Sequence, residues 1–283
     1  MDGAVSHLAS THAPKGTYIG VLMLASLFVE AWDFYSIAFV LTFVRQQFNP
    51  SALMLGLTAA AVQAVRDRQR ELKLPESFEW IENSAPEMAA AAAEAGLEVV
   101  AHPLMVLAGS AQVPPLPAGI TVRIVTPEDP ELDRIWAVPA VAFSHPGTSV
   151  GDAGPAERDK IAADHDGGTI AMLRERLRSG QSVLAAAFGP DGPLAAGSCQ
   201  AVDSVAEITG VGVLPSVRRQ GLGAAVTALL AADALDRAVQ TIFLSASDAA
   251  VARVYARIGF REIGTAMIAE PAGFSRLPLA SPA

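Results

Sequence analysis

The sequence predicts an α/β fold (α+β), with helices flanking a mixed central sheet and a hydrophobic helix ahead of them. Three observations carry this prediction. Beyond residue 64, short apolar runs rich in β-branched residues alternate with alanine-rich stretches of helical length. Residues 206–223, AEITGVGVLPSVRRQGLG, have the pattern of a strand that breaks into a basic, glycine-containing turn and opens a helix. Residues 17–44 form an almost unbroken apolar run.

Composition narrows the class of protein. The chain has 283 residues, 51% of them hydrophobic and 17% charged, which allows one ordinary domain and a further apolar segment. The formal net charge of −9 argues against nucleic acid as a partner, because phosphate contacts need a basic surface. The single cysteine, Cys199, excludes an internal disulfide and fits a reducing compartment, as an inert strand residue. No cluster of metal-ligating residues is apparent, so no metal is expected.

The N-terminal part is expected to divide at residue 17. Residues 1–16 are polar and are expected to be disordered, and residues 17–65 are expected to form one or two membrane segments. The run 17–44 is longer than the ~20 residues that cross a bilayer. Glu30 and Asp33 interrupt it, and a carboxylate at membrane depth costs about 2.5 to 3.5 kcal/mol. These two acids are therefore expected to face protein or water.

Residues 30–48, EAWDFYSIAFVLTFVRQQF, with the apolar residues 51–65, resemble the start of a major facilitator superfamily transporter over residues 17–63. The glycine-rich second helix of that family does not follow, and so few spans cannot enclose a transport path. A membrane tether and a fused transporter fragment both stay open. The basic residues after the second run belong on the cytoplasmic side, which places the rest of the chain in the cytoplasm: Arg66, Arg68, Arg70 and Lys73.

Residues 66–112 are expected to form a small accessory α/β unit. It comprises a strand near 78–82, an alanine-rich helix at 86–95 and a second strand at 97–107. Residues 113–119, VPPLPAG, are proline-rich and uncharged, as expected of a linker.

The main domain is expected over residues 120–275, as an α/β unit complete in itself. Its first strand is 120–125, and helices follow at 129–143 and 156–178. Strands at 183–188 and 194–202 form a hairpin around the turn Gly-Pro-Asp-Gly.

The strand at 206–214 and the turn after it have the features of an anion site. Gly210 and Gly212 inside the strand indicate a bulge, and Pro215 ends the ladder. The turn Arg-Arg-Gln-Gly-Leu-Gly then precedes a helix that runs to about Arg237, so that free N–H groups and the positive helix end face one spot. Arg218 and Arg219 add charge, and the glycines let the backbone approach an anion.

A second group of residues follows this helix. Residues 241–245, TIFLS, have the pattern of a short buried strand, and Asp248 is placed to cap the next helix. That helix carries Tyr255 and is closed by Gly259-Phe260.

The turn and the Tyr-x-x-Ile-Gly-Phe-like segment together resemble the two signatures of the GNAT (Gcn5-related) N-acetyltransferase superfamily, over about residues 121–270. The resemblance implies the GNAT acyl-CoA N-acyltransferase fold and acetyl-CoA as cosubstrate. It implies that the turn cradles the pyrophosphate while the splayed strand pairs with the pantetheine arm. The residues expected to bind the coenzyme are Val211, Gly212, Val213, Arg218, Arg219, Gln220, Gly221, Leu222, Gly223 and Ala224.

Acetyl transfer to an amine needs a neutral amine, a polarised carbonyl and a proton for the departing thiolate. Backbone N–H groups near residues 211–213 can polarise the carbonyl. Tyr255 resembles the general acid of the family, and its alternative is a core tyrosine that packs on the strand. Glu207 lies in an Ala-Glu-Ile segment that resembles the one holding the catalytic base of the histone-acetyltransferase branch. Its alternative is a strand glutamate facing solvent.

The predicted function is transfer of the acetyl group of acetyl-CoA to a primary amine of a small molecule or peptide. The alternatives are a non-catalytic acetyl-CoA-binding regulatory module and a fusion fragment of a membrane transporter. The sequence gives no indication of the oligomeric state.

Overall fold

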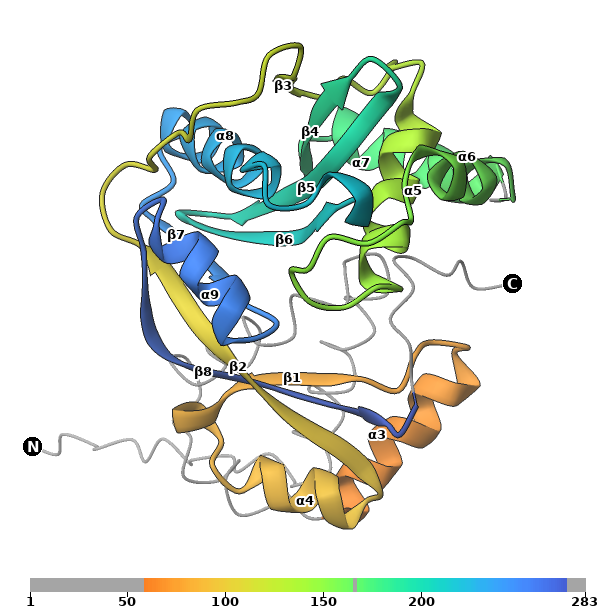
Figure 1. Ribbon diagram of the computed structural model, residues 1–283. Coiled ribbons are helices and arrows are strands. Elements are labelled where there is room, and N and C mark those ends of the chain that lie inside the picture. The colour runs from red at the N-terminus through yellow and green to blue at the C-terminus, as the bar shows by residue number, and fades with distance from the viewer. Residues whose placement is uncertain (1–58, 165–166, 274–283) are drawn as a thin grey trace, which may run out of the picture. The chain divides into compact units, whose positions relative to one another are not determined.

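The computed structural model describes residues 59–164 and 167–273. This part of the chain contains both helices and strands (Figure 1). The elements, in chain order, are α3 (Ala59–Glu71), β1 (Phe78–Ile81), η4 (Glu82–Ser84), α4 (Met88–Glu94), β2 (Leu97–Leu107), β3 (Thr121–Ile124), α5 (Leu132–Phe143), α6 (Pro155–Asp164), α7 (Gly167–Arg178), β4 (Val183–Gly189), β5 (Gly192–Val202), β6 (Val205–Val213), η5 (Pro215–Val217), α8 (Leu222–Asp236), β7 (Thr241–Ser245), α9 (Ala249–Ala256) and β8 (Phe260–Pro271).

The eight strands form one sheet in the order β1-β8-β2-β7-β6-β5-β4-β3. Every neighbouring pair is antiparallel except β6 and β7, which run parallel. The predicted mixed sheet flanked by helices is therefore confirmed. The stretch expected as one helix over 156–178 contains two helices, α6 and α7, on either side of residues 165 and 166.

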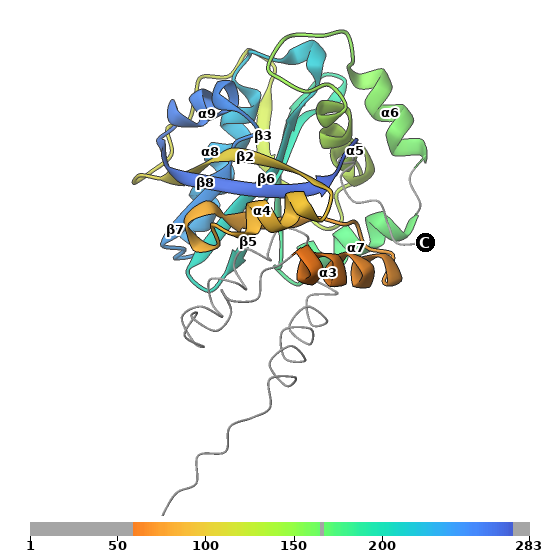
Figure 2. The same ribbon diagram turned by 90° about the horizontal axis from the view of Figure 1, so that it is seen from below.

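The position of β2 differs from the expectation that the sheet is complete from residue 120 onward. β2 lies before the linker in the chain, yet in the sheet it lies between β7 and β8. Its pairing with β8 runs along the whole strand, from Leu97 opposite Pro271 to Leu107 opposite Phe260. The yellow β2 runs beside the blue β8 in both views (Figures 1 and 2). Residues 97–107 are therefore an inner strand of the sheet that the later residues build.

The helices α3 and α4 cover one face of β1, β2 and β8 and share a small core with it. Val62 of α3, Ala92 of α4 and Trp80 of β1 are each at most 2% exposed in this cluster. Because side chains alternate between the two faces of a strand, Glu79 lies on the face of β1 opposite Phe78 and Trp80.

Residues 59–65, the end of the region expected in the membrane, belong to α3. None of the described helices is both long enough and apolar enough to cross a bilayer. The remainder of that region, and the expected disordered segment 1–16, lie outside the described residues.

The larger core lies around β4 to β7. On one face, α8 packs against the sheet: a Cβ built at Gly197 of β5 would lie 3.2 Å from Val226 of α8. On the other face lies α5, since a Cβ built at Gly212 of β6 would lie 2.8 Å from the Cα of Pro139. These contacts assign each residue of β5 and β6 to the α8 face or the α5 face.

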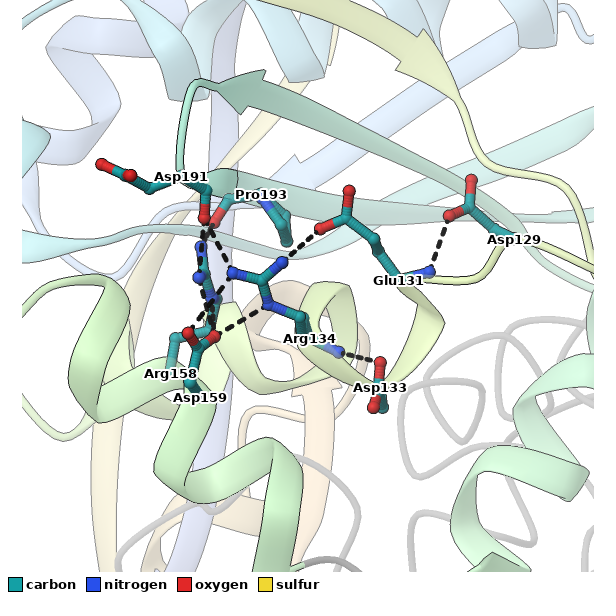
Figure 3. A network of polar contacts seen from close by, with 8 residues as sticks. All are labelled: Asp129, Glu131, Asp133, Arg134, Arg158, Asp159, Asp191 and Pro193. Carbon is teal, nitrogen blue, oxygen red and sulfur yellow. Dashed lines mark hydrogen bonds and ion pairs between the residues drawn. The ribbon is translucent and has the colours of Figure 1, made fainter.

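Two arginines join α5, α6 and the β4–β5 turn (Figure 3). Arg158 has no exposed side-chain surface and donates to the carbonyl oxygens of Asp191 at 2.8 Å and Pro193 at 2.5 Å. Arg134 donates to the same Asp191 carbonyl at 2.8 Å, and both guanidinium groups contact Asp159. Although burial opposes it, donation from Arg134 and Arg158 lowers the pKa of Asp159.

Candidate active site

The strands β6 and β7 separate after three residue pairs. They pair in parallel only from Val205 opposite Thr241 to Glu207 opposite Phe243, although β6 continues to Val213. Gly210 has a φ of +64°, and the register with β5 shifts between Ala196 and Ser198, which is the predicted bulge. On the β7 side, residues 208–213 therefore have no neighbouring strand within the described part of the chain. The backbone edge left there can pair with an extended ligand.

The residues after β6 lead directly into the first helical turn of α8. The first hydrogen bond of the helix runs from Ala225 N to Gly221 O at 2.9 Å, so the N–H groups of residues 222–224 have no acceptor within the helix. Leu222 and Ala224 bury their side chains, which leaves only their backbone to face a ligand. The N–H groups and the positive end of the α8 dipole form the predicted arrangement for an anion.

Each of the two glycines of the turn is required by the local backbone structure. Gly221 has a φ of +81°, a left-handed conformation that other residues rarely adopt. A Cβ at Gly223 would lie 3.1 Å from Cγ2 of Val213, so this glycine lets the helix approach the strand. The two glycines thus let the turn lie close against β6.

The two arginines of the turn lie in different surroundings. Arg219 and the following Gln220 are exposed, as expected for residues that add charge or hydrogen bonds to an anion site. The guanidinium of Arg218 instead donates to four backbone carbonyl oxygens, including Ala142 O at 2.9 Å and His145 O at 2.7 Å. Burial lowers the pKa of Arg218. Sequence reasoning missed these contacts, because their acceptors lie far away in the chain.

Glu207 lies on the α5 face of the sheet, opposite Gln200 of β5. Its side chain is half-buried, and burial raises the pKa of its carboxyl well above the ordinary value. The negative charge of Glu79, on β1, raises that pKa further. Sequence reasoning missed Glu79. The one signal in the sequence is its position between Phe78 and Trp80, which puts its side chain on the face of β1 away from the small core. A carboxyl with a raised pKa is suited to accept a proton nearer neutral pH.

Tyr255 lies on α9, whose N-terminus is capped as predicted: Asp248 Oδ1 accepts from the N–H groups of Ala250 and Val251 at 2.7 and 2.8 Å. The tyrosine is 8% exposed, and its ring centroid lies 6.1 Å from that of Phe260. Burial raises the pKa of Tyr255 to about 12, so the phenol keeps its proton at neutral pH and has a proton to donate. No hydrogen bond within residues 59–164 and 167–273 joins Tyr255 to Glu207.

Cys199 is buried on the α8 face of β5, where burial raises the pKa of its thiol to about 12. The thiol therefore stays protonated at neutral pH and is not an activated nucleophile. Among the described residues, no three side chains of metal-ligating type gather at one place.

Comparison with known proteins agrees with this geometry. The model of the acetyltransferase (GNAT) family matches residues 154–260, which include the turn and Tyr255. A solved GCN5-related N-acetyltransferase from Kribbella flavida has 26% sequence identity and a TM-score of 0.51, with 76% of each chain covered. Another, from Sphaerobacter thermophilus, has 18% identity and a TM-score of 0.48, covering 71% of this chain and 62% of that one. No curated protein sequence matches.

The fold and the family match define an enzyme of the acyltransferase class. The part of the chain that contains the split strand and the turn matches a GNAT acetyltransferase domain, and this match and the fold support acetyl transfer. Acetyl-CoA is the usual donor in this family. The comparisons give no support to the transporter resemblance of residues 17–63, most of which lie outside the described residues.

Proposed function

We propose that this domain transfers the acetyl group of acetyl-CoA to a primary amine of a small molecule or peptide, with the coenzyme bound along β6 and the following turn. One observation carries the proposal. The unpaired edge of β6 beyond Glu207 leads directly to the free N–H groups at the start of α8. An extended, amide-containing arm that ends in a pyrophosphate matches this order of a strand edge and an anion site.

Within this proposal the coenzyme is held mainly by backbone. Val211, Gly212 and Val213 offer their peptide groups to the pantetheine arm, and one of these N–H groups polarises the thioester carbonyl. The pyrophosphate accepts hydrogen bonds from the turn, where Arg219 and Gln220 add exposed side chains. The remaining residues contribute peptide groups alone: Arg218, Gly221, Leu222, Gly223 and Ala224.

The proposed proton transfers use two groups whose environments separate their pKa values. Glu207 accepts the proton of the amine, through water, so that the nitrogen attacks the thioester carbonyl with a free electron pair. When the tetrahedral intermediate collapses, the C–S bond breaks and Tyr255 donates its proton to the departing thiolate, while the extra proton of the nitrogen leaves through water and restores the phenol. The raised pKa of each group supports its part, since the carboxyl gains proton affinity and the phenol stays protonated.

The role of Tyr255 is tested with Tyr255→Phe, which keeps the ring and its packing against Phe260 but removes the donor. We expect kcat to fall about 10²-fold while the Kd of acetyl-CoA stays nearly unchanged. Release of free thiol across a panel of amines measures the rate, and calorimetry measures binding. Wild-type protein that binds acetyl-CoA yet releases no thiol with any amine favours the regulatory-module alternative. Unchanged turnover in the variant returns Tyr255 to a packing role.

The pH dependence of the rate tests Glu207. Because its pKa is raised, the acidic limb of the rate profile is expected above the pH at which an ordinary glutamate ionises. Glu207→Gln removes this limb. Glu79→Gln removes a neighbouring negative charge, so it lowers the pKa of Glu207 and moves the limb to lower pH.

The matched control for that experiment is Glu82→Gln, which neutralises an exposed acid in the turn just after β1. It should leave the limb in place. If the acidic limb survives in Glu207→Gln, the base is another group. If the limb does not move in Glu79→Gln, the charge of Glu79 does not affect the pKa of Glu207.

Attachment to a membrane through residues 17–65 and a cytoplasmic location remain part of the proposal. They are supported by the apolar run 17–44 and by the basic residues 66–73 that follow. Residues 59–65 lie in α3, where Val62 is buried against the small core, so the proposed membrane segment ends before Ala59.

A further inference from the structure

The Arg218 guanidinium links two segments that are distant in the chain. Its donors reach Val213 O at 3.3 Å on the strand side and Ser149 O at 3.3 Å on the other. Two shorter bonds reach Ala142 O and His145 O, at the C-terminal end of α5. A cation among the last carbonyls of a helix is favourable, because those oxygens lack helical donors and carry the negative end of the dipole. One side chain of the turn thereby holds the end of α5.

The loop between α5 and α6, residues 144–154, is held to the same turn by its backbone. Gly151 N donates to Pro215 O at 3.1 Å, and Ser216 N donates to Ala153 O at 2.9 Å. The two segments also pack without space for side chains, since a Cβ at Gly154 would lie 2.7 Å from the Ser216 hydroxyl. The α5–α6 loop and the residues just before Arg219 therefore form one assembly.

This loop follows the helix that lies on the Glu207 face of the sheet. Pro139 of α5 is packed against Gly212, and the strand register places Glu207 on the same face as Gly212. An amine that is deprotonated by Glu207 must approach from that face. The α5–α6 loop is thus joined to the coenzyme-binding turn. It lies at one end of the sheet face from which the acceptor approaches.

We propose that Arg218 is a positioning residue that couples coenzyme binding to the α5–α6 loop, which contributes to the acceptor site. The inference rests on the proposed function, in which the pyrophosphate of coenzyme A accepts hydrogen bonds from the backbone of the turn. Those bonds further restrain the base of the Arg218 side chain, and the guanidinium transmits the restraint to the carbonyls of α5 and the loop. Binding of the coenzyme and ordering of the loop then reinforce one another, as linkage requires.

The experiment is hydrogen exchange on the full chain with coenzyme A as the probe. The amides to follow are those of residues 144–154, including His145 and Gly151, which donate to Ala142 O and Pro215 O. In the wild type, saturating coenzyme A should slow their exchange roughly fivefold or more, the lower end of usual coupling between sites. In Arg218→Gln the loop should exchange faster, and coenzyme A should no longer slow it, although calorimetry still detects binding.

Arg219→Gln is the matched control, because it removes one positive charge from the next residue of the turn and leaves the carbonyl contacts in place. Its loop should respond to saturating coenzyme A as in the wild type. An equal response in Arg218→Gln, or an equal loss in both variants, overturns the inference. If the wild type binds no coenzyme A, the proposed function fails and the coupling fails with it.

If Arg218→Gln does not fold, Arg218→Lys replaces it. A lysine ammonium keeps the charge but has three donors on one atom, so it cannot reach all four carbonyls that the planar guanidinium contacts. The effect of coenzyme A on loop exchange should then be intermediate. A full wild-type response in Arg218→Lys contradicts the role of the guanidinium.

Discussion

A chain that begins at residue 113 is expected not to fold into a soluble monomer. It lacks β1 and β2, and β2 is the inner strand between β7 and β8. Without β2, both neighbours present unpaired backbone edges, which promote aggregation. The side chains of Leu104 and Met105, 6% and 2% exposed, also leave the core. Gel filtration and the cooperativity of urea unfolding measure the outcome.

Two longer chains serve as controls. A chain from residue 59 keeps every described element and should unfold cooperatively. A chain from residue 95 lacks α3, β1 and α4 but keeps β2, so it should still fold, with lower stability because the small core is lost. A monomeric, cooperatively unfolding chain from residue 113 contradicts the assignment of β2 as an essential strand.

Arg158→Leu is expected to lower the free energy of unfolding by about 3 to 5 kcal/mol. The leucine keeps much of the buried volume but removes the Arg158 donor from the buried carbonyl of Pro193, while the Asp191 carbonyl keeps only its bond from Arg134. It also removes one of the two guanidinium groups on Asp159 (Figure 3). A buried carbonyl that loses a donor costs more than an exposed one, so most of the loss arises at Pro193. The midpoint of urea unfolding reports it.

The matched control is Arg178→Leu, because Arg178 is half-exposed and pairs only at the surface with Glu128 and Glu175. Its loss should cost less than about 1 kcal/mol. Similar midpoints for the two variants show that the buried network adds little beyond an ordinary surface pair.

Local patterns in the sequence predicted most elements well. The strands at 97–107 and 241–245 have the predicted bounds, and Asp248 caps α9 as its position before an apolar helical run indicated. Such features depend on a few adjacent residues. The place of β2 in the sheet depends on partners such as Pro271 and Phe260, which no local pattern specifies. The same reason explains why residues 120 onward looked complete.

In the candidate site too, features set by adjacent residues were predicted and features set by tertiary contacts were not. The bulge at Gly210 and the free N–H groups of the turn follow from glycine positions and from the start of a helix, and both were predicted. The charge of Glu79 near Glu207 and the carbonyls around Arg218 depend on tertiary contacts. From the motif alone, Arg218 and Arg219 looked equivalent, and only the contacts of α5 distinguish them. The roles of Glu207, Tyr255 and the coenzyme-binding residues stay predictions until the variants are measured.

The insertion of β2 between β7 and β8 also has a consequence for synthesis on the ribosome. Translation delivers residues 97–107 early, but both of their strand partners come from residues 241–271. This apolar strand must therefore wait, unpaired, while almost all of the domain is made. Pairings between such distant segments fold slowly and leave hydrophobic surface exposed in the meantime. The nascent chain is accordingly most in need of a chaperone just before β8 leaves the exit tunnel.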